Sequence, residues 1–122
     1  KMIKFKSLNQ SKEFKEILKK RRLNTKYFTV YFEKNIKSFK KDINKYLNIS
    51  FVMKKNIGNA VKRNKIKRKL KSIIRKILEE NKLIDLNYTY VILGKNDVYK
   101  DKFQMIFNDV NNIFRKIKQT GM

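Results

Sequence analysis

The residues best suited to chemistry lie in one run, 54–76, which reads KKNIGNAVKRNKIKRKLKSIIRK. It holds 11 Lys or Arg in 23 residues and no acid. Ammonium and guanidinium groups bind phosphate through charge and hydrogen bonds. Asn64 interrupts the run, and its amide both donates and accepts, so it can contact a base edge or a 2′-hydroxyl where Lys meets only phosphate. These residue types predict a nucleic-acid-binding surface.

Repulsion along the same run supports that prediction. Lys67 and Lys71, like Lys71 and Arg75, stand four residues apart, where like charges each cost a helix a few tenths of a kcal/mol. A solvated helix face usually mixes signs, so this one is expected to meet a counter-charge. A membrane-surface helix is the competing interpretation, but such helices usually carry bulky aromatic residues where this run has Ile and Leu.

The composition limits the other functions. The chain has 122 residues, 33 basic and 10 acidic, for a net charge of +23, and lacks Cys and His. It is therefore expected to form a single domain, 1–122, with a polyanionic partner and no disulfide, thiolate or imidazole metal site, or His general base. The opening residues do not have the pattern of a signal peptide, and no apolar run approaches about 18 residues. We expect a cytoplasmic protein without a membrane partner.

Hydrophobic periodicity predicts an α+β fold, a small mixed sheet flanked by helices in the order α-β-β-β-α-β-α. Phe28, Val30 and Phe32 should share one face of a strand, with Tyr27, Thr29 and Tyr31 on the other. The expected helices are 11–21, 59–80 and 101–118, and the expected strands are 26–33, 47–53 and 88–93, with room for another near 34–40.

Gly58 and Asn59 precede the basic helix, where a strand must turn. Glycine permits a positive φ, and Asn is a favoured N-cap. The N-terminus of a helix also offers free N–H groups to a phosphate. A structural and a binding role are both compatible with this pair.

The segment KKNIGNAVKRNKIKRKLKSIIR closely resembles the signature of the bacterial ribonuclease P protein subunit. LNQSKEFKEILKK is similar to the first helix of that family, YFTVYF to the strand that follows, and YTYVILGK to a later strand. The resemblance extends over nearly the whole chain. It implies the fold class of the second domain of ribosomal protein S5, with a left-handed βαβ crossover made by the basic helix.

The resemblance also implies a function. The protein would bind the catalytic RNA subunit and the 5′ leader of precursor tRNA, and the RNA with its Mg²⁺ ions would perform the hydrolysis, so no catalytic side chain is expected in the protein. The protein itself would be monomeric in isolation. The expected leader cleft comprises Phe14, Leu18 and Tyr31. The expected RNA contacts are Lys54, Lys55, Asn59, Lys62, Arg63, Asn64, Lys65, Lys67 and Arg68.

Three features depart from the family pattern. Lys65 stands where the motif has Arg and so lacks the bidentate fork. Phe51 and Met53 are bulkier than the usual Ser residues, and Leu18 replaces an aromatic residue.

Two other classes of protein stay open. A small ribosomal protein has similar charge and size but no need of GNAVKRNKIKR. An autonomous nuclease would need clustered acidic residues. No two of the following five stand at a spacing typical of a two-metal site: Asp42, Asp85, Asp97, Asp101 and Asp109.

Overall fold

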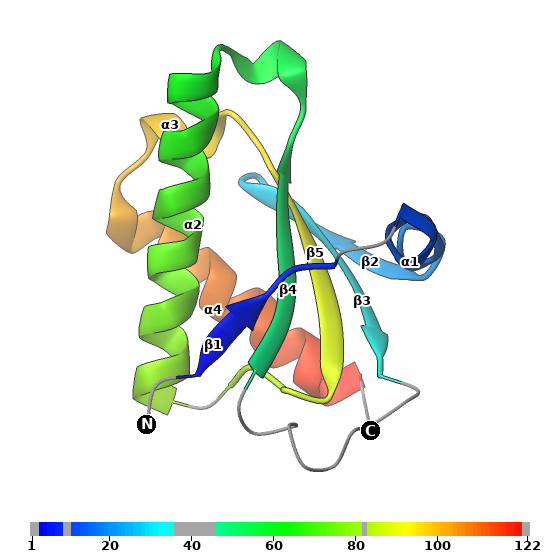
Figure 1. Ribbon diagram of the computed structural model, residues 1–122. Coiled ribbons are helices and arrows are strands. Elements are labelled where there is room, and N and C mark those ends of the chain that lie inside the picture. Colours follow the sequence, from blue (N-terminus) through cyan, green and yellow to red (C-terminus); the bar gives the residue numbers. More distant parts are fainter. Residues whose placement is uncertain (1–2, 9–10, 36–45, 82, 121–122) are drawn as a thin grey trace.

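The computed structural model of the protein describes residues 3–8, 11–35, 46–81 and 83–120. Figure 1 shows how the helices and strands are arranged. In chain order they are β1 (Lys4–Lys6), α1 (Ser11–Ile17), β2 (Arg21–Asn24), β3 (Phe28–Lys34), β4 (Tyr46–Met53), the 3-10 turn η1 (Lys55–Ile57), α2 (Ala60–Asn81), β5 (Tyr88–Gly94), α3 (Asp97–Lys100) and α4 (Phe103–Thr120).

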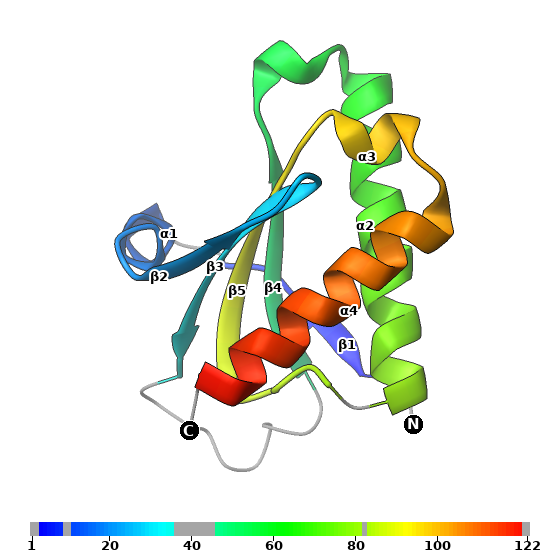
Figure 2. The ribbon, with the colours of Figure 1, turned by 180° about the vertical axis from the view of Figure 1, so that it is seen from behind.

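The strands form one mixed sheet in the order β1-β4-β5-β3-β2. β4 runs parallel to its neighbours β1 and β5, whereas β3 runs antiparallel to β5 and β2. Side chains alternate between the two faces along each strand. Val91 of β5 is paired with Tyr31 of β3 on one side and with Ser50 of β4 on the other, so these three residues share one face of the sheet. We call this the α1 face, because α1 lies on that side of the sheet (Figures 1 and 2).

The core lies between the other face of the sheet and the helices α2 and α4, which share that side (Figure 2). Burying an Ile or Leu side chain stabilises the fold by roughly 1.5–3 kcal/mol, far more than each like-charge pair on α2 costs. The buried residues of α2 are Ile66, Leu70, Ile73, Ile74 and Ile77, and those of α4 are Ile106, Val110, Ile113, Phe114 and Ile117.

The connection from β4 through α2 to β5 is left-handed. Seen from the helix side with β4 running upward, the parallel neighbour β5 lies to the left of β4 (Figure 2). Nearly all βαβ connections have the opposite hand. The left-handed crossover implied by the sequence resemblance is therefore present.

The predicted elements need four corrections. The first helix ends at Ile17 rather than at 21, because residues 21–24 pair with β3 as a further strand. β1 was not predicted. α3 was not predicted either, whereas α4 matches the last predicted helix, 101–118, to within two residues. Tyr27 does not share a face with Thr29 and Tyr31, because it precedes β3 and its ring is buried in the core. Most of the region near 34–40 lies outside the described residues.

Several other predictions of the fold are confirmed. Phe28, Val30 and Phe32 are all buried on the helix side of β3. The strand predicted at 47–53, the basic helix predicted at 59–80 and the strand predicted at 88–93 each match an observed element to within two residues. The fold class is α+β, as expected.

Candidate nucleic-acid interface

Gly58 and Asn59 form the joint at which the chain leaves η1 and enters α2. Gly58 has φ 155° and ψ −166°, a backbone region that essentially only glycine occupies. A Cβ atom there would lie 2.8 Å from Cδ of Lys62, too close for an ordinary contact. Asn59 Oδ1 accepts a hydrogen bond of 3.0 Å from the backbone N–H of Lys62. The predicted N-cap role of Asn59 is confirmed.

One flank of α2 faces β1 and β4 and holds two cations against aromatic rings. The Arg75 guanidinium lies 4.4 Å from the ring centroid of Phe5, and the Lys71 ammonium lies 5.8 Å from that of Phe51. The two rings stack on each other with centroids 6.2 Å apart. Arg75 also donates a hydrogen bond to the backbone carbonyl of Ile3. Phe51 is bulkier than the family residue at this position, and its ring packs against that of Phe5 in β1.

The opposite flank of α2 holds three lysines spaced seven residues apart against α3 and α4. Lys69 Nζ donates to the backbone carbonyls of Val98 at 2.9 Å and Asp101 at 2.6 Å. The Lys62 ammonium lies 5.0 Å from the centroid of the Tyr99 ring. Lys76 lies over Phe103 and Phe107, at 5.7 and 5.3 Å. These lysines are engaged with the protein itself.

Asp101, which follows α3, contacts the residues just before β3. The Tyr27 hydroxyl donates a 2.6 Å hydrogen bond to Asp101 Oδ2, and Lys26 Nζ lies 3.3 Å from that oxygen. The hydrogen bond from Tyr27 and, after it, the Lys26 ammonium hold the pKa of Asp101 below its usual value, against the effect of desolvation. The same hydrogen bond, helped by burial, raises the pKa of Tyr27 to about 12. Together with Lys69, this contact anchors α3.

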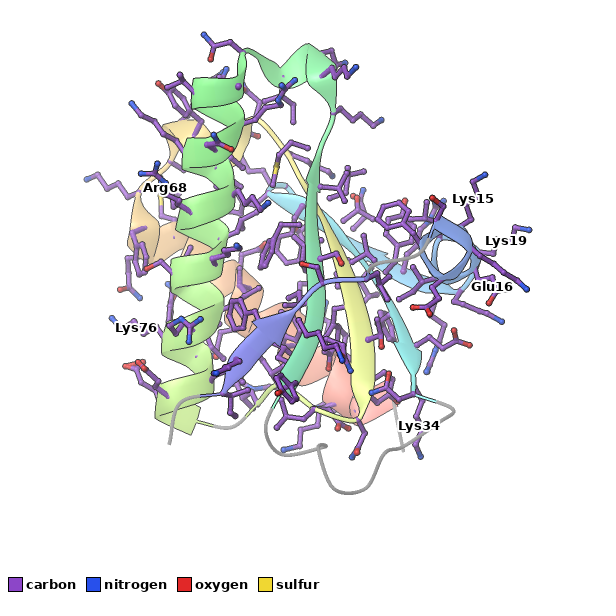
Figure 3. All side chains as sticks on the ribbon, viewed as in Figure 1. Lys15, Glu16, Lys19, Lys34, Arg68 and Lys76 are labelled. Atoms are coloured by element: carbon purple, nitrogen blue, oxygen red, sulfur yellow. The ribbon has the colours of Figure 1, made fainter. Side chains whose placement is uncertain are left out.

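The remaining polar residues of the first half of α2 have no partner among the described residues. Within the described ranges, the side chains of five residues make no hydrogen bond, ion pair or ring contact, and we call them the unpaired set: Arg63, Asn64, Lys65, Lys67 and Arg68. Figure 3 shows Arg68 on α2 directed away from the sheet. Arg63 and Lys67 are half-buried and the other three are exposed. An unpaired cationic surface of this kind is free to meet phosphates.

A groove of about 430 Å³ lies on the α1 face of the sheet, and we call it the α1-face groove. Tyr31, half-buried, stands in its wall beside its cross-strand partner Arg22. Lys54, which comes just before η1, reaches the same groove, so the basic run borders it. Its lining residues are Arg22, Asn24, Thr29, Tyr31, Lys54, Ile57, Leu93, Gly94, Lys95 and Asn96.

Hydrogen bonds fix the polar wall of this groove. Lys95 Nζ donates to the carbonyl of Thr25 at 2.6 Å and to Oδ1 of Asn24. The Thr29 hydroxyl donates to the same Asn24 oxygen at 2.6 Å. The β2–β3 hairpin is thereby tied to the end of β5. Arg22 and Lys54 have no such partner within the described part of the chain, so their cationic groups stay available.

The other two residues predicted for the leader cleft lie elsewhere. Phe14 is half-buried and Leu18 is 39% exposed, and neither lines the α1-face groove. The sequence prediction missed Arg22, Asn24 and Lys95. The predicted helix ended at 21 and no strand was expected at 22–24, which hid the first two, whereas Lys95 was signalled by its place in YTYVILGK.

Acidic side chains do not gather in the part of the chain that the structure describes. Among the described residues there is no group of three or more His, Cys, Asp or Glu side chains that could hold a metal ion. The described side chains therefore do not provide a Mg²⁺ site of that size. In the same part of the chain, no helix combines the length and the apolar character that crossing a membrane requires.

A mixed sheet crossed by a basic helix, with an unpaired cationic surface and a basic groove, defines a small α+β nucleic-acid-binding protein. A family model described as Ribonuclease P matches residues 2–118. The chain belongs to the ribonuclease P protein family, whose members are components of the ribonucleoprotein that processes the 5′ ends of tRNA. Its partner is therefore RNA, and the alternative of a ribosomal protein is disfavoured.

Relatives and solved structures agree with this assignment. The Ribonuclease P protein component of Fusobacterium nucleatum is 32% identical over 116 residues, covering 92% of this chain and 96% of the relative. That of Carboxydothermus hydrogenoformans is 28% identical over 120 residues, covering 98% and 97%. The solved ribonuclease P protein of Thermotoga maritima has a TM-score of 0.70 at 22% identity, covering 91% of this chain and 96% of that one. This last likeness concerns the fold alone.

Proposed function

We propose that the protein assists the removal of the 5′ leader from precursor tRNA by binding two RNA segments at once. The unpaired set of α2 docks on the RNA subunit, and the α1-face groove holds the leader. The observation that carries this proposal is the position of Lys54, which lines the groove and immediately precedes the turn into α2. A leader held in the groove is thus placed next to the docked RNA.

The proposed docking step relies on those cations of α2 that are not engaged by the protein itself. Lys69 donates its hydrogen bonds to Val98 of α3 and to Asp101 just after it, and Arg75 donates to Ile3 just before β1. The side-chain donors of the unpaired set make no such bond within the described ranges and are free for phosphate. Asn64 is exposed among these cations, and its amide can read a 2′-hydroxyl or a base edge. Lys54 and Lys55, both exposed beside the start of α2, extend the same surface.

The leader step relies on Tyr31. Its ring offers a stacking surface for an unpaired base, worth roughly 1–3 kcal/mol, while Arg22 and Lys54 meet the adjoining phosphates. Phe14 on α1 and Leu18, just after that helix, do not line the groove, and we propose them as secondary contacts with the leader.

The hydrolysis itself is assigned to the RNA. Mg²⁺ would be held mainly by RNA phosphates and water, and the protein would supply counter-charge and leader binding. We also propose that the protein is monomeric before assembly and acts in the cytoplasm, where bacterial tRNA is matured.

Reconstitution tests the proposal. The purified protein alone should leave precursor tRNA intact at every Mg²⁺ concentration, and the RNA subunit alone should cleave only at high Mg²⁺. Adding the +23 protein should lower the Mg²⁺ requirement, because its cations reduce repulsion between the two RNAs. Cleavage by the protein alone, or no change in the Mg²⁺ requirement, would contradict it.

A further inference from the structure

A second basic hollow lies at the β2–β3 edge of the sheet, away from α2. It is open and has a volume of about 550 Å³, and we call it the edge hollow. Figure 3 shows Lys19 and Lys34 on the opposite side of the molecule from Arg68 and Lys76. An RNA docked on α2 would therefore leave the edge hollow accessible. Its lining residues are Lys19, Lys20, Arg21, Phe32, Glu33 and Lys34.

Arg21 lies over two aromatic rings in this hollow. Its guanidinium carbon lies 5.0 Å from the ring centroid of Phe32 and 5.8 Å from that of Tyr88. The guanidinium has no hydrogen bond or ion pair within the described part of the chain. An Arg stacked on rings keeps its N–H donors directed outward as a rigid fork that matches a phosphate. The hollow thus contains a preoriented and unsatisfied anion-binding group.

The charge around Arg21 favours the same kind of ligand. Four cationic side chains and one acid line the hollow, a formal sum of +3. Glu33 is engaged by Lys20 at 3.5 Å, which leaves Lys19, Arg21 and Lys34 without an acidic partner among the described residues. Two or more phosphates in sequence would satisfy these three cations better than a single anion.

The edge hollow adjoins the α1-face groove across β2. Arg22 and Tyr31 line the groove, and their chain neighbours Arg21 and Phe32 line the hollow. Adjacent strand residues are only about 3.3 Å apart and point to opposite faces. Since β2 is the edge strand, a flexible single strand can pass around this edge from one site to the other. A rigid duplex could not follow that path.

We propose that the edge hollow binds the phosphate backbone of single-stranded leader RNA upstream of the nucleotides held in the α1-face groove. This inference rests on the proposed function and extends it, because it predicts that affinity grows with leader length beyond the groove. Arg21 supplies the oriented fork, and Lys19 and Lys34 supply flanking charge.

The test uses holoenzyme reconstituted with the RNA subunit and precursor tRNAs bearing unstructured leaders of about 5 or about 20 nucleotides. Dissociation constants are measured over a range of salt. For the long leader, Arg21→Ala should weaken binding about 3- to 30-fold and reduce the salt slope by about 0.7. The short leader should bind Arg21→Ala and wild type equally, and Arg21→Lys should lose less than Arg21→Ala.

Lys12→Ala is the charge-matched control, because Lys12 is exposed at the far end of α1 and does not line the hollow. It should not change the difference between long and short leaders. Equal losses for both leaders with Arg21→Ala, or no loss for either, would overturn the inference. Arg21→Ala is also tested with polyglutamate. If this variant lost polyglutamate binding and bound the long leader as wild type does, the hollow would be a site for an acidic polypeptide and the inference would be overturned too. If wild-type holoenzyme neither bound nor cleaved the short-leader precursor, the proposed function itself would fail.

Discussion

At the scale of single residues, backbone geometry explains two uncharged residues within the basic run. Gly58 has a backbone conformation closed to other residues, and Asn59 caps the helix that begins immediately after it. A run built for charge alone would need neither. Both residues place the first turn of α2, and with it Arg63 and Asn64, at a fixed angle to β4.

Gly58→Ala should therefore destabilise the fold. The cost is expected to be about 1–3 kcal/mol, from backbone strain and from the contact of the new Cβ with Lys62. Asn59→Ala should cost about 1 kcal/mol through loss of the cap, and Asn59→Ser should cost almost nothing. Urea unfolding measures all three. A Gly58→Ala protein as stable as wild type would show that the observed φ is not required.

Asp101 should make stability depend on acid pH. Its pKa is lowered in the folded state by the Tyr27 hydroxyl and by Lys26, so the pairing stabilises the protein above the unfolded-state pKa of about 3.8. That stability is lost as the pH falls through the lower folded-state value. Melting temperatures between about pH 5 and about pH 2 should fall less steeply for Asp101→Asn than for wild type. Tyr27→Phe should flatten the curve more than Lys26→Ala. Identical curves for Asp101→Asn and wild type would contradict the assignment.

At the scale of elements, the sequence predicts α2, β4 and β5 well because each has a strong period. Ile66, Leu70 and Ile73 recur at helical spacing, and Leu47 and Ile49 at strand spacing. β1 and β2 have three and four residues, too few for a period to appear. The sequence 18–24 is compatible with helix, and only pairing with β3 makes part of it a strand.

The site was predictable in the same uneven way. The unpaired set lies in one segment and follows from local spacing. The α1-face groove depends on which residues face each other across strands, such as Arg22 and Tyr31. That register was out of reach because the predicted helix ran to 21 and no strand was expected at 22–24. The left-handed crossover could be implied only by resemblance, because the pattern of helices and strands does not contain it.

Lys67 and Lys69, two residues apart on α2, should behave in opposite ways. Lys69→Met should cost about 1–3 kcal/mol of stability by removing two hydrogen bonds to α3, and amide exchange in 97–101 should accelerate. Lys67→Met should leave stability unchanged and weaken binding to the RNA subunit. Chemical denaturation and RNA titration on both variants make the comparison. The division of α2 into engaged and unpaired cations fails if the two variants lose affinity and stability alike.

At the scale of the whole molecule, the charge of +23 is distributed around the sheet rather than gathered on one helix. The unpaired set lies on α2, the α1-face groove on the other side of the sheet, and the edge hollow at its β2 edge. A small protein arranged in this way can contact more than one RNA segment. The fold separates these three surfaces. Lys54 lines the α1-face groove and immediately precedes the turn into α2, so it connects the groove with the unpaired set along the chain.

Assembly with the RNA subunit should depend steeply on salt. If about six side chains around α2 meet phosphate, the logarithm of the association constant should fall with the logarithm of salt with a slope of about −4 to −5. Replacing Arg63 and Arg68 together by Ala should reduce the slope by about 1.5. Lys116→Ala, an exposed residue of α4, serves as the control and should not change it. A wild-type slope near −1 would rule out α2 as the main docking surface.

The most direct test of the two-surface account is a set of dissociation constants for precursor tRNA and mature tRNA, with wild-type and Tyr31→Ala holoenzymes. Stacking of a base on an aromatic ring is worth roughly 1–3 kcal/mol, so Tyr31→Ala should weaken precursor binding by about 5- to 100-fold. Mature tRNA has no leader and should bind both holoenzymes equally. If Tyr31→Ala changes the dissociation constants for precursor and mature tRNA alike, or changes neither, Tyr31 does not contact the leader and the α1-face groove is not the leader site.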